Sequence, residues 1–190
     1  MTGTLLHVGT RKGLFVVDGS GASARVVAEH FLGDNVNLTL TDPRDGTWYA
    51  VLDHGHFGTK LHRSHDHGTT WTEVGVPAYP TKPEGFVDID MWGKDRDWAL
   101  MGIWALEPAL DRDGALWCGT SPGGLFRSND RGDTWEIVEG LWNMETRVLW
   151  NGGGLDHAPQ VLQVAHKFGG QPLFDQPGNH IGVEPVPQVF

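Results

Sequence analysis

Short runs of alternating apolar and polar residues follow one another between residues 5 and 138, and each run ends at a cluster of Gly, Asp or Pro. Period-two patterning bounded by such turn residues predicts β-strands. Connections of three to six residues make neighbouring strands antiparallel. The pattern therefore predicts an all-β fold, with the clearest strands at 5–10, 47–52, 59–64, 115–120, 125–128 and 134–138.

The runs recur as a repeated unit. In two units, a strand, a Gly-rich turn and a second strand lead into an octet and then into a Trp-led strand; the octets are SHDHGTTW (64–71) and SNDRGDTW (128–135). The N-terminus carries a degenerate copy of the unit, LLHVGT-RKG-LFVVDGSG, without an octet. Repetition of one such unit is the signature of a repeat protein. With first strands expected at 37–43 and 103–110, each unit is a four-stranded up-and-down sheet, which predicts a β-propeller.

Both octets fit the template Ser-x-Asp-x-Gly-x-Thr-Trp, and each residue type suits a tight turn. Ser and Asp side chains hydrogen-bond to a turn's own backbone, Gly supplies a positive φ, and Trp anchors the returning strand in a core. A catalytic or metal-binding role for the aspartates is the alternative, although the acidic residue that closes a calcium loop is missing. The residues expected to build the turns are Ser64, Asp66, Gly68, Trp71, Ser128, Asp130, Gly132 and Trp135.

The octet resembles the Asp box of the BNR repeat family, which includes sialidases and sortilin-type receptors, and the resemblance covers residues 1 to about 142. It implies a propeller of more than three blades in which the boxes are structural. The sialidase catalytic set is not recognisable: the Arg-Ile-Pro motif is absent, and the tyrosines, Tyr49 and Tyr79, fall in a strand and in a Pro-flanked loop. A fold of this kind hosts enzymes and binding proteins alike.

The units divide the chain into blades at about 1–36, 37–76 and 103–142, with a long loop at 77–102. Together they form a propeller region at 1–150. Residues 151–190 contain no octet and five prolines, which predicts a degenerate, truncated or non-native tail. We expect an incomplete propeller, with a worn fourth blade in the tail as the alternative. Open blade edges favour self-association.

Strand alternation places the octets at one end of the blades and the Asp53–Gly58 loop, the other inner turns and the long loop at the opposite end. Loops gathered at one end of a rigid scaffold are typical binding sites. We therefore expect a binding or scaffold module for a glycan or protein. The candidate ligand-binding residues are Arg11, Lys12, His54, His56, Trp92 and Trp98.

The alternative is a glycoside hydrolase, which needs two carboxylates roughly 5–10 Å apart. The candidates are Asp53, Asp88, Asp90 and Glu107, all expected on or near the loop face. A binding module requires fewer coincidences and is favoured over an enzyme. His54 and His56 with Asp53 form a candidate metal site, but solvated loop imidazoles are the simpler interpretation, so neither a metal nor a cofactor is expected.

The net charge and the length of the apolar runs limit the kinds of partner that we expect. A net charge of −10 without a Lys/Arg cluster argues against nucleic acid. The sequence has no run of about 18 apolar residues that would predict a membrane span. Its first residues lack the basic segment and apolar run of a signal peptide, so we expect a cytoplasmic protein. The single cysteine, Cys118, lies in an apolar strand and excludes an internal disulfide.

Overall fold

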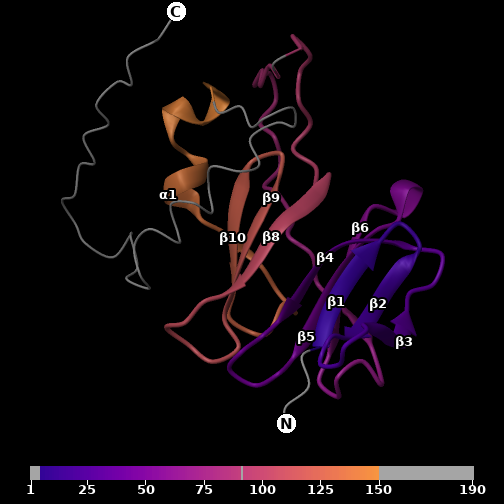
Figure 1. Ribbon diagram of the computed structural model, residues 1–190. Coiled ribbons are helices and arrows are strands. Elements are labelled where there is room, and N and C mark those ends of the chain that lie inside the picture. The colour runs from indigo at the N-terminus through magenta and orange to yellow at the C-terminus, as the bar shows by residue number, and fades with distance from the viewer. Residues whose placement is uncertain (1–4, 91, 150–190) are drawn as a thin grey trace, which may run out of the picture.

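The computed structural model describes residues 5–90 and 92–149, which form three antiparallel sheets (Figure 1). The predicted tail at 151–190 lies outside the described residues. The first sheet contains β1 (Leu5–Thr10), β2 (Gly13–Asp18) and β3 (Arg25–His30). The second contains β4 (Asn35–Thr41), β5 (Trp48–Asp53), β6 (Thr59–Ser64) and β7 (Thr72–Val74). The third contains β8 (Gly102–Pro108), β9 (Leu116–Ser121), β10 (Gly124–Ser128) and β11 (Glu136–Ile137).

In the described residues the three sheets are arranged as successive blades of a β-propeller. The strands of each sheet pair in chain order, the sheets pack face to face, and β4 lies against both β1 and β8. Figure 1 shows the resulting fan, with the first sheet in indigo and the third in pink and orange. The expected first strands at 37–43 and 103–110 are confirmed as β4 and β8, each shifted by one or two residues. The described part of the first sheet has three strands.

The strand β5 shows how the second sheet is covered on both faces. Its run Trp48–Leu52 is buried throughout. Tyr49 and Val51 pack with Leu61, Leu116 and Phe126 against the third sheet, whereas Ala50 and Leu52 pack with Leu14 and Val36 against the first. A strand that is buried on both faces loses the alternation typical of a half-exposed strand. The second sheet is therefore the middle layer of the described structure.

Arg44 joins the second and third sheets through their first turns. Its guanidinium binds the buried carboxylate of Asp42, with Nε 2.9 Å from Oδ1 and Nη2 2.6 Å from Oδ2. Its remaining N–H groups donate to three backbone carbonyls of the equivalent turn in the next sheet, those of Ala109, Arg112 and Ala115. The planar guanidinium of Arg44 thus hydrogen-bonds both to the buried Asp42 carboxylate and to the backbone of the neighbouring sheet.

The two octets fold into nearly identical turns between β6 and β7 and between β10 and β11. In the first, Ser64 Oγ donates to Asp66 Oδ1 (2.8 Å) and accepts from the N–H of Gly68 (2.8 Å). Asp66 in turn accepts from the backbone and hydroxyl of Thr70, and these hydrogen bonds lower the pKa of Asp66 to about 2. Positions four and five of each octet have positive φ, as in Arg131 and Gly132. The aspartate carboxylates of both octets are therefore hydrogen-bonded within their own turns.

Candidate functional site

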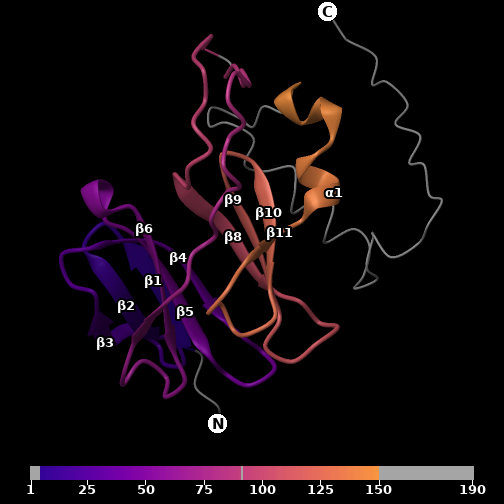
Figure 2. The same ribbon diagram turned by 180° about the vertical axis from the view of Figure 1, so that it is seen from behind.

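The end of the blades opposite the octets, here called the loop end, carries most of the irregular structure. Because neighbouring strands are antiparallel, the β1–β2 turn with Arg11 and Lys12 projects to the same end as η1 (Gly55–Phe57). The long loop, residues 75–101 between β7 and β8, leaves and returns at this end. Figure 2 shows η1, the long loop and α1 (Glu139–Trp142) together at one end of the molecule, and the octet turns at the other.

A pocket of about 450 Å³ opens at the loop end, between the second sheet and the link that joins it to the first sheet. It contains His54 from the predicted ligand-binding set. The other lining residues come from the link between the sheets and from β5, η1, β6 and β7: Phe31, Asp34, Leu52, Phe57, Lys60, His62 and Glu73.

The polar groups of the pocket are partly paired. Lys60 Nζ donates to Glu73 Oε1 at 2.7 Å, and His54 Nδ1 lies 3.6 Å from Asp34 Oδ1. The ring of His62 packs against Phe31 at 5.0 Å, and its buried Nδ1 has no hydrogen-bond partner among the described residues. Burial lowers the pKa of His62 and outweighs the nearby Glu73 carboxylate. His62 thus lines the pocket as a neutral imidazole at neutral pH, with its Nδ1 buried and without a hydrogen-bond partner among the described residues.

The pocket exists because the second sheet departs from the repeat. With the octets aligned on Ser64 and Ser128, Lys60, His62 and Glu73 occupy the positions of Gly124, Phe126 and Ile137. In the third sheet those positions face the second sheet, and Phe126 and Ile137 fill the core there. The polar replacements leave the equivalent space between the first and second sheets open. Sequence reasoning missed these three residues, although this alignment reveals them.

A buried ionic cluster holds the base of the long loop. The Asp88 side chain is fully buried; its Oδ1 lies 3.1 Å from Arg96 Nη1, and its Oδ2 lies 3.3 Å from Arg147 Nη1. The indole Nε1 of Trp98 also donates to Asp88 Oδ2, at 2.9 Å. Arg147, in η2 (Glu145–Leu149), stacks 3.9 Å from the ring centroid of Trp142 in α1. The cluster therefore fastens the long loop to the segment that follows the third sheet.

The outer part of the long loop is a hydrogen-bonded hairpin that exposes apolar side chains. Asp90 Oδ1 accepts from the backbone N–H groups of Trp92 (2.9 Å) and Lys94 (2.8 Å), and Ile89 pairs with Asp95 in a β-bridge. Lys82 Nζ donates to Asp95 Oδ1 at 2.5 Å. The exposed large apolar residues described in this outer part of the loop are Phe86 (41 %), Val87 (62 %), Ile89 (47 %) and Trp92 (61 %).

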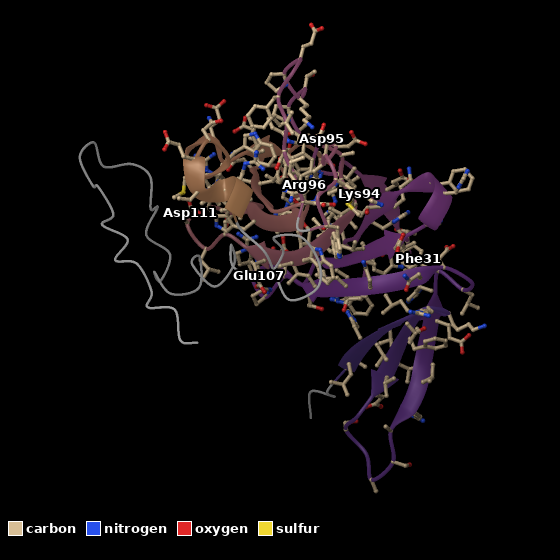
Figure 3. All side chains as sticks on the ribbon, turned by 90° about the horizontal axis from the view of Figure 1, so that it is seen from above. Phe31, Lys94, Asp95, Arg96, Glu107 and Asp111 are labelled. Atoms are coloured by element: carbon tan, nitrogen blue, oxygen red, sulfur yellow. The ribbon has the colours of Figure 1, made fainter. Side chains whose placement is uncertain are left out.

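The four candidate carboxylates do not form a pair. Asp53 Oδ1 accepts from the N–H of Gly55 at the start of η1, Asp88 lies in the ionic cluster, and Asp90 organises the hairpin. The expected placement of Glu107 near the loop face is wrong, because β8 runs towards the octet end and Glu107 is the last residue but one of that strand. Figure 3 shows Glu107 on the third sheet, apart from Lys94 and Asp95 of the long loop.

The remaining predicted ligand-binding residues divide between exposed and buried positions. Arg11, Lys12 and His56 are exposed on turns at the loop end, and Trp92 is exposed on the hairpin. Trp98 is half-buried in the ionic cluster, where its ring contacts Trp142 at 4.9 Å. The structure brings His54 into the pocket and leaves His56 outside the pocket lining.

Within residues 5–90 and 92–149, no three His, Cys, Asp or Glu side chains gather closely enough to hold a metal ion. No helix in these ranges has the length and apolar character needed to cross a membrane.

Two solved structures are similar to this chain at the level of fold. One is YCF48 bound to D1 peptide, with 16 % sequence identity and a TM-score of 0.41, covering 72 % of this chain and 40 % of that one. The other is a GH74 xyloglucanase from Xanthomonas campestris, with 20 % identity and a TM-score of 0.41, covering 72 % of this chain and 21 % of that one. The chain thus spans less than half the length of either protein. No family model and no curated protein matches it, so membership of the Asp-box repeat family stays a prediction.

Proposed function

We propose that this protein is a propeller-type binding module that holds another protein through its loop end, with the long loop as the main contact. The observation that supports this most strongly is the contrast between the two parts of that loop. Its base is fixed by the buried Asp88 cluster, whereas Val87, Ile89 and Trp92 are kept in water. A rigid base reduces the ordering cost of binding, and exposed tryptophan is enriched among interface hot spots.

The pocket supplies a second contact on the same end of the molecule. Phe31 and Phe57 offer apolar walls, while His62 and the Lys60–Glu73 pair offer donors and acceptors. A side chain or backbone group of a bound protein fits this mixture of apolar and polar lining. The Asp-box family assignment, which we also propose on the strength of the octets, is compatible with such a role because that fold does not dictate chemistry.

A glycoside hydrolase is the less favoured alternative. Hydrolysis of a glycosidic bond requires two carboxylates facing a common substrate. Here Asp88 is buried between two arginines, Asp90 binds the backbone of its own hairpin, and Glu107 lies near the octet end. A glycan as the ligand of a non-catalytic module is a separate arm of the test below.

The test compares Trp92→Ala with Trp117→Ala, because Trp117 is half-buried on β9 opposite Glu107, towards the octet end of the third sheet. Affinity capture from the source cell extract, followed by titration with each purified candidate, should give a protein whose Kd rises at least about 30-fold with Trp92→Ala. Trp117→Ala should bind as the unchanged chain does. A candidate that binds both variants equally contradicts the proposal. Binding on a glycan array, or turnover of aryl glycosides, that is sensitive to Asp53→Asn would favour the alternatives.

A further inference from the structure

Asp34 carries the least engaged charge of the pocket. Within the described part of the chain its carboxylate accepts no hydrogen bond, and Nδ1 of His54 lies 3.6 Å from Oδ1, beyond hydrogen-bonding distance. Lys60 and Glu73, by contrast, neutralise one another through a 2.7 Å contact. Burial lowers the pKa of His62 and keeps that ring uncharged at neutral pH. With histidine counted as neutral, the pocket therefore retains the negative charge of Asp34.

The turn that carries Asp34 is fixed in its conformation. Phe31 has a φ of 52°, in the left-handed region that bulky residues rarely adopt. The N–H of Asp34 donates to the Phe31 carbonyl at 3.0 Å, and the N–H of Gly33 donates to the Lys12 carbonyl at 3.1 Å, which ties the turn to the first sheet. Strained residues of this kind cluster at ligand-binding sites. The Asp34 turn is thus organised before a ligand arrives.

Aromatic rings line the pocket together with this carboxylate. The ring of Phe31 is held between His62 and Trp71, with centroid distances of 5.0 and 4.9 Å, and Phe57 of η1 is 78 % exposed. The face of an aromatic ring attracts a cation, and a flat guanidinium also stacks on it. An apolar ligand would cover Asp34 without pairing its charge, and an anion would be repelled by it. The lining therefore favours a flat cation.

We propose that the pocket receives an arginine side chain of the bound protein, with its guanidinium on the Asp34 carboxylate and beside the rings of Phe31 and Phe57. The inference rests on the proposed function, because it names the group of the partner that enters this site. The N–H groups of arginine match the two oxygens of a carboxylate, and its aliphatic stem packs on an apolar wall such as Leu52. The net charge of −10 also favours the approach of a basic partner.

Titration of the full chain with short peptides, followed through amide chemical shifts in NMR spectra, tests the inference without the partner. The probes are acetyl-Gly-Arg-Gly-amide and its citrulline counterpart, which has nearly the same shape but no charge. The arginine peptide should shift amides of residues 31–34 and 54–62, with a Kd on the order of millimolar. The citrulline peptide should bind at least about 5-fold more weakly, because it cannot form the ion pair.

Two variants and one control assign the recognition to the pocket. Asp34→Asn should raise the Kd of the arginine peptide at least about 5-fold and remove the preference over citrulline. Phe57→Ala should raise that Kd at least about 2-fold, since it removes an aromatic face. The control Asp113→Asn changes the net charge equally, at an exposed position in the turn between β8 and β9 at the octet end, and should bind as the unchanged chain does. The same spectra show whether each variant keeps the fold.

Equal binding of the two peptides overturns the inference, because the charge would then go unrecognised. Unchanged affinity in Asp34→Asn, shifts confined to amides outside the pocket, or no shift at tens of millimolar peptide also overturn it. All of these results leave the proposed function standing if Trp92→Ala still weakens binding of the captured protein. Conversely, a captured protein that binds independently of Trp92 refutes the proposed function, while the peptide titration still reports on the pocket.

Discussion

Asp88 is expected to be a structural residue whose loss detaches the long loop. Its carboxylate faces two guanidinium groups, those of Arg96 and Arg147, and one indole N–H, that of Trp98. The substitution Asp88→Asn preserves the shape of the side chain and one acceptor oxygen while removing the negative charge. Arg96 and Arg147, both almost fully buried, would then lose the carboxylate they share.

The magnitude follows from these distances. At 3.1 and 3.3 Å, each charge pair has a gross attraction of about 5 kcal/mol at an effective dielectric constant of about 20. Much of this only offsets the desolvation of the three groups, so the net loss on removing one partner is about 3–5 kcal/mol. Local opening of the loop limits the loss in global stability, because the chain can expose the cluster without unfolding the sheets.

Urea unfolding and amide hydrogen exchange measure the two parts of this effect. Asp88→Asn should lower the urea midpoint and abolish protection of amides in residues 75–101 and 139–149, while amides of β5 and β9 stay protected. The control Asp90→Asn weakens only two hydrogen bonds at the exposed hairpin and should cost less than about 2 kcal/mol. If Asp88→Asn leaves both the midpoint and the exchange of residues 75–101 unchanged, the structural role is refuted. The same result would return Asp88 to the list of catalytic candidates.

Two further predictions concern the contacts between sheets. Arg44→Ala leaves the buried Asp42 carboxylate and three carbonyls of the third sheet without their donor, and should lower the free energy of unfolding by about 3–5 kcal/mol. Arg25→Ala, which removes an exposed ion pair with Asp18, should lower the urea midpoint far less than Arg44→Ala does, because solvent screens the pair; equal effects would contradict the role of Arg44. Burial lowers the pKa of His7, His30 and His62 at the contact between the first and second sheets, with a further contribution from His30 at His7. Unfolding restores their ordinary pKa of about 6.5, so the unfolded chain binds more protons below that pH and stability should fall as the pH drops from 7 to 5. Urea midpoints across this range should show the decline, and His62→Gln should flatten it; a pH-independent midpoint would mean that these imidazoles stay hydrated.

Much of the fold could be predicted because its determinants are local. The octet turns are closed by hydrogen bonds between residues two to four positions apart, such as Ser64 to Asp66 and Asp66 to Thr70. Strand alternation then fixes which turns share an end of a sheet. The assignment of β4 and β8 to the start of their units followed from the same repeat. These features require no knowledge of which sheet lies beside which.

The ionic cluster was beyond sequence reasoning for the opposite reason. Asp88 and Arg147 are 59 positions apart, and neither lies in a strand or in an octet. Several acids and bases of the long loop could have formed pairs equally well, and only the packed loop shows that Asp88 is buried while Asp90 is partly exposed. A catalytic carboxylate and a buried structural one have the same signature in a sequence.

Departures from the repeat locate the candidate sites better than the residue types did. Residues that serve the repeat, such as Leu61 and Phe126, are accounted for by packing between the second and third sheets. Lys60, His62 and Glu73 break the pattern at positions filled by Gly124, Phe126 and Ile137 one unit later, and the pocket lies there. The long loop is likewise an insertion, since the first and second sheets are joined by only Phe31–Asp34. In a chain of repeated sheets, the residues that follow the repeat are needed for folding. Side chains that depart from the repeat and do not pack in a core are therefore the ones that can contact a ligand.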